Sequence, residues 1–289
     1  MKESLSNGYP LIDVVLWIWF ALTALAVGWV AHGQFKGEPD QNEKSLVMKT
    51  MRWGWVLVTL YTGPFGFVVY RFIHRVRAPT SGQTEPSLCK QSVESTIHCV
   101  AGDATGILVA ALFASWLRPT MGMELIAEYI AGFAVGLFLF QALCMKSSYG
   151  GSYRRAVWGT LLPEAISMNT VMAGMIPVMI IFMSRDMSAM EPASVRFWGV
   201  MSLAFLVSTV ITFPVNWWLV ARGLKHGIGG EHQARLCPAV SAVSKMTAVV
   251  LTFAMLAGGI ILAARYGDFS MRAGDSTETK PVSSRMSGA

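Results

Sequence analysis

Long apolar runs, separated by short polar segments, dominate the hydrophobic pattern of the chain. A helix needs about 20 apolar residues to cross the hydrocarbon core of a bilayer. The sequence has seven runs of that kind, at residues 11–31, 51–72, 95–116, 121–145, 157–184, 197–221 and 239–264. Tryptophans lie near several of their ends, where interfacial aromatic residues are enriched. The pattern predicts an all-α fold, a polytopic transmembrane bundle of about seven helices.

The placement of these runs also predicts the domain organisation. Residues 1–77 hold a two-helix N-terminal membrane piece, and residues 78–94 read as a linker. Residues 95–265 hold a five-helix membrane body. The tail, residues 266–289, is rich in Ser, Thr and Gly, a composition typical of disordered segments. The first run has no small-residue cleavage site and is too long for a signal peptide, so we expect it to stay as a membrane helix.

Composition supports a membrane location. Hydrophobic residues make up 53% of the chain and charged residues 14%, whereas soluble domains carry roughly 25% charge. The net charge of +6 comes largely from Lys and Arg in short loops, which is a topology signal and not a nucleic-acid-binding patch. We therefore expect the lipid bilayer as a partner, and no nucleic acid.

The basic residues predict an orientation. The loops after the second, fourth and sixth runs carry eleven Lys and Arg, against seven in the loops after the first, third and fifth. Because cytoplasmic loops are enriched in these residues, the bias places the N-terminus inside, although Arg265 and Arg272 oppose it. The four cysteines fall on the predicted cytoplasmic side, where we expect free thiols: Cys89, Cys99, Cys144 and Cys237.

Polar and ionisable residues inside the runs gather at one membrane face. Such residues are costly in a bilayer and usually face the bundle interior or a wet cavity. Because successive runs alternate in direction, their offsets from the run ends place them within roughly 5–15 Å of the same face. They are His98, Cys99, Asp103, Gln141, Cys144, Glu164, Ser167, Met168, Asn169, Asn216 and Lys245. This grouping predicts a shared polar chamber on the cytoplasmic side.

The densest part of this group is His98-Cys99-x-x-x-Asp103. Cys99 and Asp103 are four residues apart and share a helix face, while His98 points about 100° away. Thiolate, imidazole and carboxylate together bind metal ions, and a thiol beside a histidine also serves as a nucleophile. The structural alternative is that the three side chains only pack and bond within the bundle. Glu164 fits either a helix-start carboxylate or a cation site that faces Asp103.

Seven methionines line one side of the fifth run: Met168, Met172, Met175, Met179, Met183, Met187 and Met190. At 100° per residue their directions fall within an arc of about 120°. Steps of three and four residues separate neighbouring methionines by about 5–6 Å, as a ladder of soft ligands requires. Pro177 should kink the helix in the middle of the run. Thioethers bind soft ions such as Cu(I) and also serve as adaptable packing, so both interpretations of the stripe stay open.

Four separate motifs follow one another between residues 48 and 228. They are residues 48–64, which start Met-rich and end in Leu-Tyr-Thr-Gly-Pro; His98-Cys99-x-x-Gly102-x-x-x-Gly106; Glu164-Ala-Ile-Ser167-Met168 with Gly174-Met175; and Phe213-Pro-Val-Asn216 with Arg222-Gly-x-Lys225-His226-Gly227. In this order they resemble the bacterial integral membrane family named domain of unknown function 4396. Asp103 stands where that family has a second cysteine, and Ile107 where it has a final acid.

The resemblance implies a protein of the bacterial cytoplasmic membrane, with no settled activity. It also implies an association with copper-handling proteins, which accompany some relatives. The missing second cysteine disfavours redox chemistry by a thiol pair and leaves a mixed Cys, His, Asp and Met site. Because the motifs coincide with the polar group described above, the resemblance strengthens the case that this group is functional.

The leading hypothesis is a transporter or membrane chaperone for a soft metal cation such as Cu(I), with a copper ion as ligand and a copper-handling protein as partner. The predicted metal ligands are His98, Cys99, Asp103, Glu164, Met168, Met172, Met175 and Met179. Two alternatives stay open: a membrane-embedded redox or group-transfer enzyme that uses Cys99, and a non-catalytic scaffold for membrane assembly. The chain has no phosphate loop, zinc-protease pair, serine-nucleophile elbow or c-type haem motif, so a non-enzymatic role is favoured.

Overall fold

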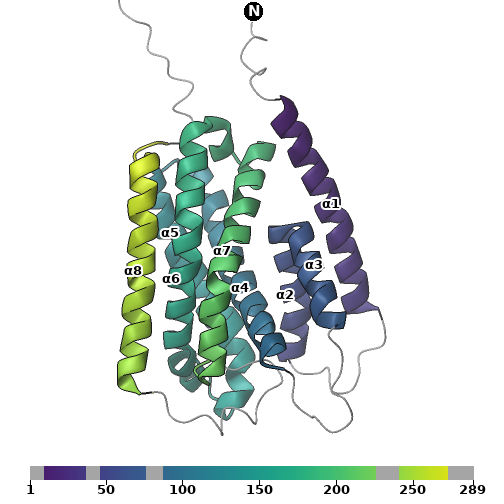
Figure 1. Ribbon diagram of the computed structural model, residues 1–289, viewed down its shortest axis with the longest axis vertical. Helices are drawn as coiled ribbons and strands as arrows, with labels where there is room; N and C mark the ends of the chain where they lie inside the picture. The colour runs from purple at the N-terminus through teal and green to yellow at the C-terminus, as the bar shows by residue number, and fades with distance from the viewer. Residues whose placement is uncertain (1–9, 37–45, 76–86, 226–240, 273–289) are drawn as a thin grey trace, which may run out of the picture.

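The computed structural model describes residues 10–36, 46–75, 87–225 and 241–272, which form a bundle of helices (Figure 1). The all-α prediction is confirmed. The α-helices of the described residues are α1 (Pro10–Phe35), α2 (Leu46–Thr62), α3 (Pro64–Arg75), α4 (Leu88–Leu117), α5 (Met121–Ala134), α6 (Tyr153–Arg185), α7 (Val195–Ala221) and α8 (Ala242–Tyr266). Shorter helical segments are η2 (Val135–Leu143), η3 (Met145–Tyr149) and η4 (Met187–Met190).

Within the described residues, six helices are long and apolar enough to cross a membrane. They are α1, α4, α5 together with η2, α6, α7 and α8. The protein is therefore an integral membrane protein in contact with the lipid bilayer. The expected second crossing, residues 51–72, differs from the prediction, because the chain turns within it and forms two helices of 17 and 12 residues instead of one.

The turn between α2 and α3 makes an antiparallel hairpin. Gly63 has a φ of +63°, a left-handed conformation that glycine adopts at no steric cost. Pro64 begins α3 at the first helical position, where its missing N–H breaks no hydrogen bond. Across the hairpin, the ring centroids of Trp55 and Tyr70 lie 5.4 Å apart. α3 therefore runs back towards the end of the bundle at which α2 begins.

Contacts with α4 fix the direction of this hairpin. The hydroxyl of Tyr61 on α2 lies 2.9 Å from Oγ1 of Thr105 on α4, and Gly54 faces Ile97 further back along both helices. α2 and α4 are therefore parallel and begin at the same membrane face, where α3 also ends (Figure 1). The hairpin is re-entrant. An apolar run long enough for one crossing is also long enough for two shorter helices that turn back. The hydrophobic pattern does not distinguish the two, so it predicted a crossing here.

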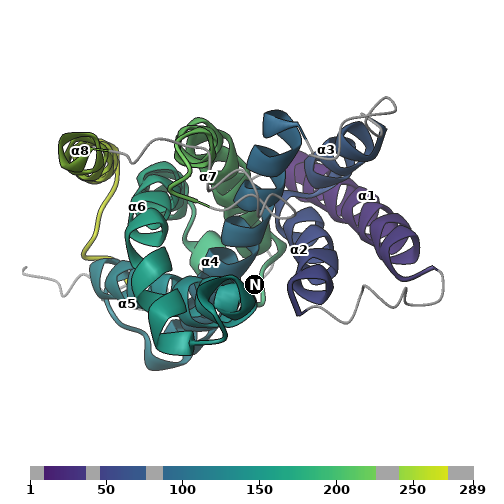
Figure 2. The same cartoon turned by 90° about the horizontal axis from the view of Figure 1, so that it is seen from below.

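The remaining helices, α4 to α8, form the body that holds the candidate site. Seen from below, α6 lies among α5, α7 and α8 (Figure 2). Its buried methionines share one hydrophobic core with Ile107 of α4, Leu125 of α5 and both Met201 and Phe205 of α7. α6 is therefore the central element of the body, and its buried methionines pack against α4, α5 and α7.

Two stretches expected outside the helices have defined structure. Residues 88–94, at the end of the expected linker, form the first turns of α4. After α8, in the expected tail, the carbonyls of Phe269 and Met271 accept hydrogen bonds from the N–H groups of Gly122 and Met121 at 3.0 and 2.9 Å. This strap satisfies two of the N–H groups that a helix start leaves without partners inside the helix.

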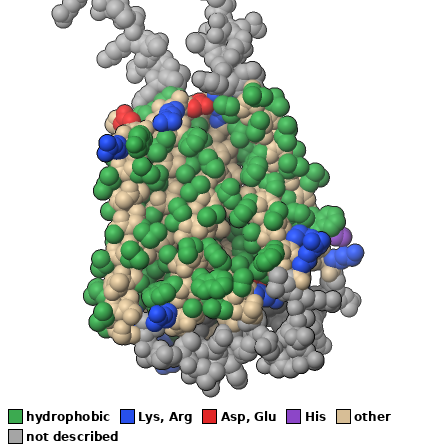
Figure 3. All heavy atoms as spheres, viewed as in Figure 1, with side chains coloured by type: hydrophobic (Ala, Val, Ile, Leu, Met, Phe, Trp, Pro, Cys, Tyr) green, Lys and Arg blue, Asp and Glu red, His purple; other side chains and the backbone are tan. Residues whose placement is uncertain are grey.

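The surface fits a bilayer. Hydrophobic side chains cover the middle of the face shown in Figure 3, whereas Lys, Arg, Asp and Glu lie towards its upper and lower ends. Large apolar side chains such as Trp17 on α1 and Ile261 on α8 are well exposed. An apolar belt of this extent marks an interaction surface, and for helices of crossing length that surface is lipid. The start of α1 and the end of α8 lie at the same end of the bundle (Figure 1).

Candidate functional site

The candidate site forms where α5 continues as a π-helix, η2. Hydrogen bonds in a π-helix span five residues, and such turns occur frequently at functional sites. Side chains from other elements reach its carbonyl groups: His98 Nε2 donates to the Phe140 carbonyl at 2.8 Å, and the Tyr153 hydroxyl donates to the Phe138 carbonyl at 3.2 Å. The apolar pattern of residues 121–145 predicted one ordinary helix, because such a pattern does not reveal a change of winding.

His98 is directed towards η2. Besides its hydrogen bond to the Phe140 carbonyl, its ring packs edge-on against the Phe140 ring at a centroid distance of 5.5 Å. Its Nδ1 atom is buried and has no hydrogen-bond partner among the residues that the structure describes. The adjacent residue, Cys99, points elsewhere, as expected for side chains about 100° apart on one helix.

Cys99 is fully buried where α4, η2 and α6 meet. Its sulfur accepts a hydrogen bond from Gln141 Nε2 at 2.7 Å and lies 3.6 Å from Glu164 Oε2, to which the thiol donates. The three side chains come from positions far apart in the sequence. The thiol is therefore held in a fixed orientation between an amide donor and a carboxyl acceptor.

Asp103 and Glu164 meet over Gly136. A Cβ atom on Gly136 would collide with Asp103 Oδ1 and Glu164 Oε1 at the same time, so this position has room for two carboxyl groups only because it is glycine. Both acids are fully buried, and both Asp103 oxygens and Glu164 Oε1 lack a hydrogen-bond donor within the described part of the chain. Two such carboxylates repel each other strongly in a low dielectric. The pair therefore needs a proton or a cation between its oxygens.

Lys225 brings a positive charge to this group from beyond α7. The chain turns back after α7, where the N–H groups of Leu224 and Lys225 both donate to the Leu219 carbonyl at 2.9 and 3.2 Å. This turn buries the Lys225 side chain, and its Nζ donates to Asn216 Oδ1 at 3.0 Å. We call Cys99, Asp103, Gln141, Glu164 and Lys225 the polar centre.

Lys225 was not among the residues that the sequence predicted for the site. Burial on its own disfavours the ammonium, but the Cys99 thiol and the carboxyls of Glu164 and Asp103 outweigh burial and raise the pKa of Lys225 above its ordinary value. Lys225 therefore stays charged at neutral pH. Lys225 does belong to the fourth sequence motif. Because it follows the predicted end of a helix, it was counted only among the basic residues of the loops. Lys245, in contrast, is partly exposed.

Residues 89–225 match the family model for a domain of unknown function, DUF4396. This part of the chain belongs to that family. The matched residues include all five members of the polar centre, and the match ends at Lys225 itself. The re-entrant hairpin and α8 lie outside the DUF4396 domain. No curated protein and no solved structure matches the chain.

The methionine stripe of the DUF4396 domain begins beside the polar centre. A Cβ atom on Gly132 would lie 2.8 Å from Met168 Cε and 3.1 Å from the Asp103 carbonyl oxygen, so the Met168 side chain and the backbone of Asp103 both pack against Gly132. The following methionines of α6 are buried in the core: Met172, Met175, Met179 and Met183. α6 continues through Pro177 and ends at Arg185, so the last two methionines of the expected stripe, Met187 and Met190, belong to η4.

The donor atoms of the polar centre fit a soft ion only with help from methionine. No group of three or more His, Cys, Asp or Glu side chains in the described ranges has the arrangement of a metal site. Cys99 contributes a thiol, the Asp103–Glu164 pair contributes unpartnered oxygens, and Met168 lies one turn deeper. A thiol with a thioether is the ligand combination that Cu(I) prefers. The described cysteines, Cys89, Cys99 and Cys144, are free thiols, and Cys237 lies outside the described residues.

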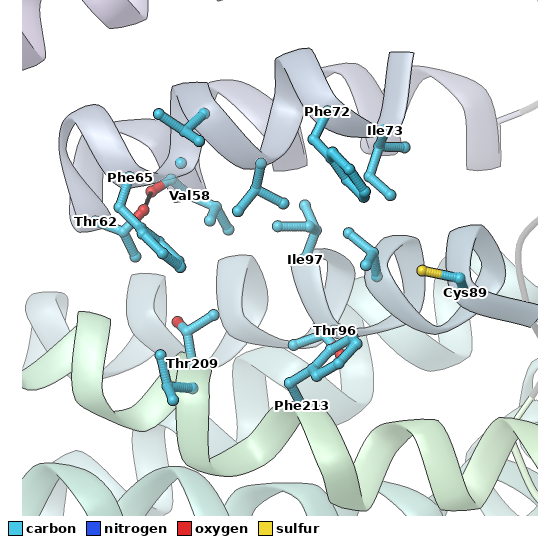
Figure 4. Close-up of a pocket in the computed structure, with 15 residues that line it drawn as sticks. Val58, Thr62, Phe65, Phe72, Ile73, Cys89, Thr96, Ile97, Thr209 and Phe213 are labelled. Carbon is cyan, nitrogen blue, oxygen red and sulfur yellow. Dashed lines mark hydrogen bonds between the residues drawn. The ribbon is translucent and has the colours of Figure 1, made fainter. Parts of the chain in front are cut away.

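A separate cleft lies between the hairpin and the DUF4396 domain (Figure 4). It has a volume of about 390 Å³, and its walls come from α2, α3, α4 and α7, with Phe65, Ile97 and Phe213 among the lining residues. Cys89 lies at one end of it (Figure 4). The lining is almost entirely apolar and includes no member of the polar centre, so the cleft is separate from the candidate site.

Proposed function

We propose that the protein carries a soft monovalent cation across the membrane, with Cu(I) as the substrate. One observation carries the proposal: the buried thiol of Cys99 donates to the Glu164 carboxyl, which meets the Asp103 carboxyl over Gly136, at the head of a row of buried thioethers. Cys99, Asp103 and Glu164 receive the ion, and Met168, Met172, Met175 and Met179 conduct it deeper. His98 holds η2 in place through the Phe140 carbonyl.

The charges of the polar centre suit a cation that arrives and leaves. In the absence of an ion, Lys225 balances part of the negative charge of Glu164 and Asp103. A cation that binds Cys99 and the carboxyls takes over that role, and Lys225 then repels it. Competition of this kind keeps the ion from binding too tightly to move on, which is a requirement of any conducting site.

The two alternatives fit these observations less well. A nucleophilic cysteine needs partial exposure and an electropositive setting, whereas Cys99 is fully buried and donates to a carboxyl group. A scaffold that uses the stripe as a docking surface would turn the methionines outwards, but Met168, Met172 and Met175 have no exposed surface.

We further propose that the face with the polar centre is cytoplasmic, in the bacterial cytoplasmic membrane, so that a copper-handling protein exchanges the ion there. Basic residues concentrate at this face, including Arg75 at the end of α3, Arg154 and Arg155 in the first turn of α6 and Arg222 after α7. Because the hairpin returns without crossing, the N-terminus then lies on the opposite, outer face. This replaces the expected inner N-terminus, which assumed a full second crossing.

The test is Cu(I) flux into liposomes that contain the purified protein, followed by a trapped fluorescent chelator. Cys99→Ser and Met168→Leu are expected to lower the flux at least tenfold. Cys144→Ser and Met51→Leu are matched controls, because both residues are buried but lie outside the polar centre and the stripe. Equal flux through the Cys99→Ser variant and the natural protein would overturn the proposal.

One observation favours a second candidate function, proton translocation. The carboxyls of Asp103 and Glu164 meet over Gly136, both Asp103 oxygens and Glu164 Oε1 have no donor among the described residues, and the charge of Lys225 acts on both acids. Such an arrangement binds and releases protons as readily as it binds a metal ion. A pH-sensitive dye in the same liposomes separates the two candidates: proton flux without copper that survives Cys99→Ser but not Glu164→Gln supports this second function.

A further inference from the structure

Glu128 on α5 is a buried acid outside the polar centre. Its side chain has no exposed surface, and both carboxyl oxygens lack a hydrogen-bond partner among the described residues. The charged group that acts on it is another acid, Glu124, one turn earlier. An ionised carboxylate in such a place is very costly unless a proton or a cation accompanies it. Packing alone gives no reason for a glutamate here, because an apolar side chain would avoid this cost.

The register of α5 against α6 gives the position of Glu128 along the methionine stripe. Gly136 lies against Glu164, and Gly132 lies against Met168, so a step of four residues back along α5 matches a step of four forward along α6. The hydrogen bond of 2.8 Å from the Tyr129 hydroxyl to Asn169 Oδ1 agrees with this register. The next step of the same register leads from Gly132 to Glu128 on α5 and from Met168 to Met172 on α6.

Glu128 also lies on the correct face of α5. The buried positions of that helix are Met121, Leu125, Glu128 and Gly132, which follow one another by four, three and four residues. Residues at this spacing form one stripe along a helix. Gly132 packs against Met168 of α6 and against Ile107 and Asp103 of α4, so this stripe lies where α5 meets both helices. Eight residues of helix separate Glu128 from Gly136, so Glu128 lies about 12 Å further into the membrane than the polar centre.

From this placement we propose that Glu128 and Met172 form a second binding site for the cation, inside the membrane. The inference rests on the proposed function, since it concerns the same ion. Thioethers are neutral, so an ion that moves along methionines alone keeps its full charge in a low dielectric, which is strongly unfavourable. A carboxylate beside the row neutralises that charge. The thioether sulfur favours a soft ion such as Cu(I) or Ag(I), and the carboxylate supplies the compensating negative charge.

The experiment counts the Ag(I) and Cu(I) ions bound by the purified, full-length protein in lipid nanodiscs. We expect two ions for the natural protein, one for Glu128→Gln and one for Cys99→Ser. Glu124→Gln is the matched control, a partly exposed acid on the same helix, and keeps both ions. Met172→Leu is expected to weaken the binding of the second ion at least tenfold. This variant keeps the test informative if Glu128→Gln does not fold.

The outcomes separate this inference from the proposed function. If Glu128→Gln and Met172→Leu both bind as many ions as the natural protein, with unchanged affinity, the second site is overturned while the polar centre stands. If Cys99→Ser binds as many ions as the natural protein while Glu128→Gln loses one, the proposed entry site fails and the site at Glu128 is supported. A natural protein that binds neither ion overturns both.

Discussion

The sulfur of Cys99 lies 3.6 Å from Oε2 of Glu164, although the two residues are 65 positions apart in the chain. This contact joins α4 to α6 at the depth where η2 supplies Gln141 as a donor. All three side chains at this point are polar and buried inside the helix bundle. Buried polar groups of this kind are costly unless each is satisfied, so the arrangement around the contact is sensitive to small changes of shape.

Gly136→Ala tests how closely the carboxyl pair is packed. The added methyl group would collide with Asp103 and Glu164 together, so the helices or the carboxyls must shift. We expect a loss of stability of about 1–3 kcal/mol, as for other overpacked cores, visible as a lower melting temperature in detergent. Gly28→Ala is the control, because nothing lies within 4 Å of its added Cβ. Equal melting temperatures for the Gly136→Ala variant and the natural protein would show that the pair is not packed as described.

Lys225→Gln tests the positive charge of the polar centre. Removing one partner of a buried charged group leaves the others uncompensated, and the expected loss of stability is about 3 kcal/mol. Arg222→Gln is the control, because Arg222 is exposed and lies over the Trp218 ring, outside the polar centre. A melting temperature that drops equally for both variants would argue against a special role for Lys225.

The pH dependence of the Lys225 effect follows from the sign of its pKa shift. The pKa of Lys225 is raised in the folded protein above the ordinary value of 10.5, because nearby Cys99, Glu164 and Asp103 outweigh burial. The contribution of Lys225 to the stability of the fold is therefore complete below pH 10.5, and it is lost as pH rises through the pKa of the folded protein. The difference in melting temperature between the Lys225→Gln variant and the natural protein should stay constant from pH 6 to about 9. A difference that vanishes within this range would contradict the assignment.

Asp186→Asn tests the ion pair at the opposite face. Arg196 Nη1 lies 2.9 Å from Asp186 Oδ2 and its Nε lies 2.7 Å from Asp13 Oδ1, so one guanidinium links η4 to α1 and α7. Burial works against ionisation of Asp186, yet hydrogen bonds from Ser188 and Arg196 keep its pKa below the ordinary 3.8. A lowered pKa means stability that is present above pH 3.8 and lost as pH falls through the folded pKa.

The expected effect of Asp186→Asn is small. The pair is partly exposed, so solvent screening limits the loss to below about 1 kcal/mol at pH 7. The difference in melting temperature from the natural protein should shrink to zero as pH falls from 3.8 through the lower folded pKa, because Asp186 then becomes protonated in both states. Glu191→Gln, on the same connecting segment, is the control. A difference that grows towards acidic pH would mean that folding raises the pKa of Asp186 instead of lowering it.

The sequence predicted the helices well because apolar runs of crossing length have few alternatives. It also predicted that Cys99, Asp103 and Glu164 share a depth, since α4 to α7 alternate in direction whether or not the hairpin crosses. It did not predict the turn at Gly63, because a glycine in an apolar run fits a bent crossing and a hairpin equally. Lys225 escaped notice because its burial depends on how the chain folds back after α7. These features depend on contacts between distant segments, which periodicity does not record.

The re-entrant hairpin predicts which ends of the chain share a membrane face. Arg196 at the start of α7 binds Asp13 at the start of α1, so the N-terminal end of α1 lies beside η4. Seven full crossings would have placed the N-terminus and the connection between α6 and α7 on opposite faces. We therefore expect an N-terminal epitope tag and a cysteine introduced by Ser188→Cys to be accessible from the same side, the outside of the cell.

Labelling of intact cells with a membrane-impermeant maleimide measures this, in a background where Cys89 and Cys237 are replaced by serine. Ser188→Cys is exposed on η4 and should react directly, as should the tag with its antibody. Ser147→Cys, exposed on η3 at the other face, is the matched control and should react only after the cells are made permeable. A tag that stays protected while Ser188→Cys reacts would mean that residues 51–72 cross the membrane after all. Reaction of Ser147→Cys alone in intact cells would instead invert the proposed orientation and place the polar centre at the outer face.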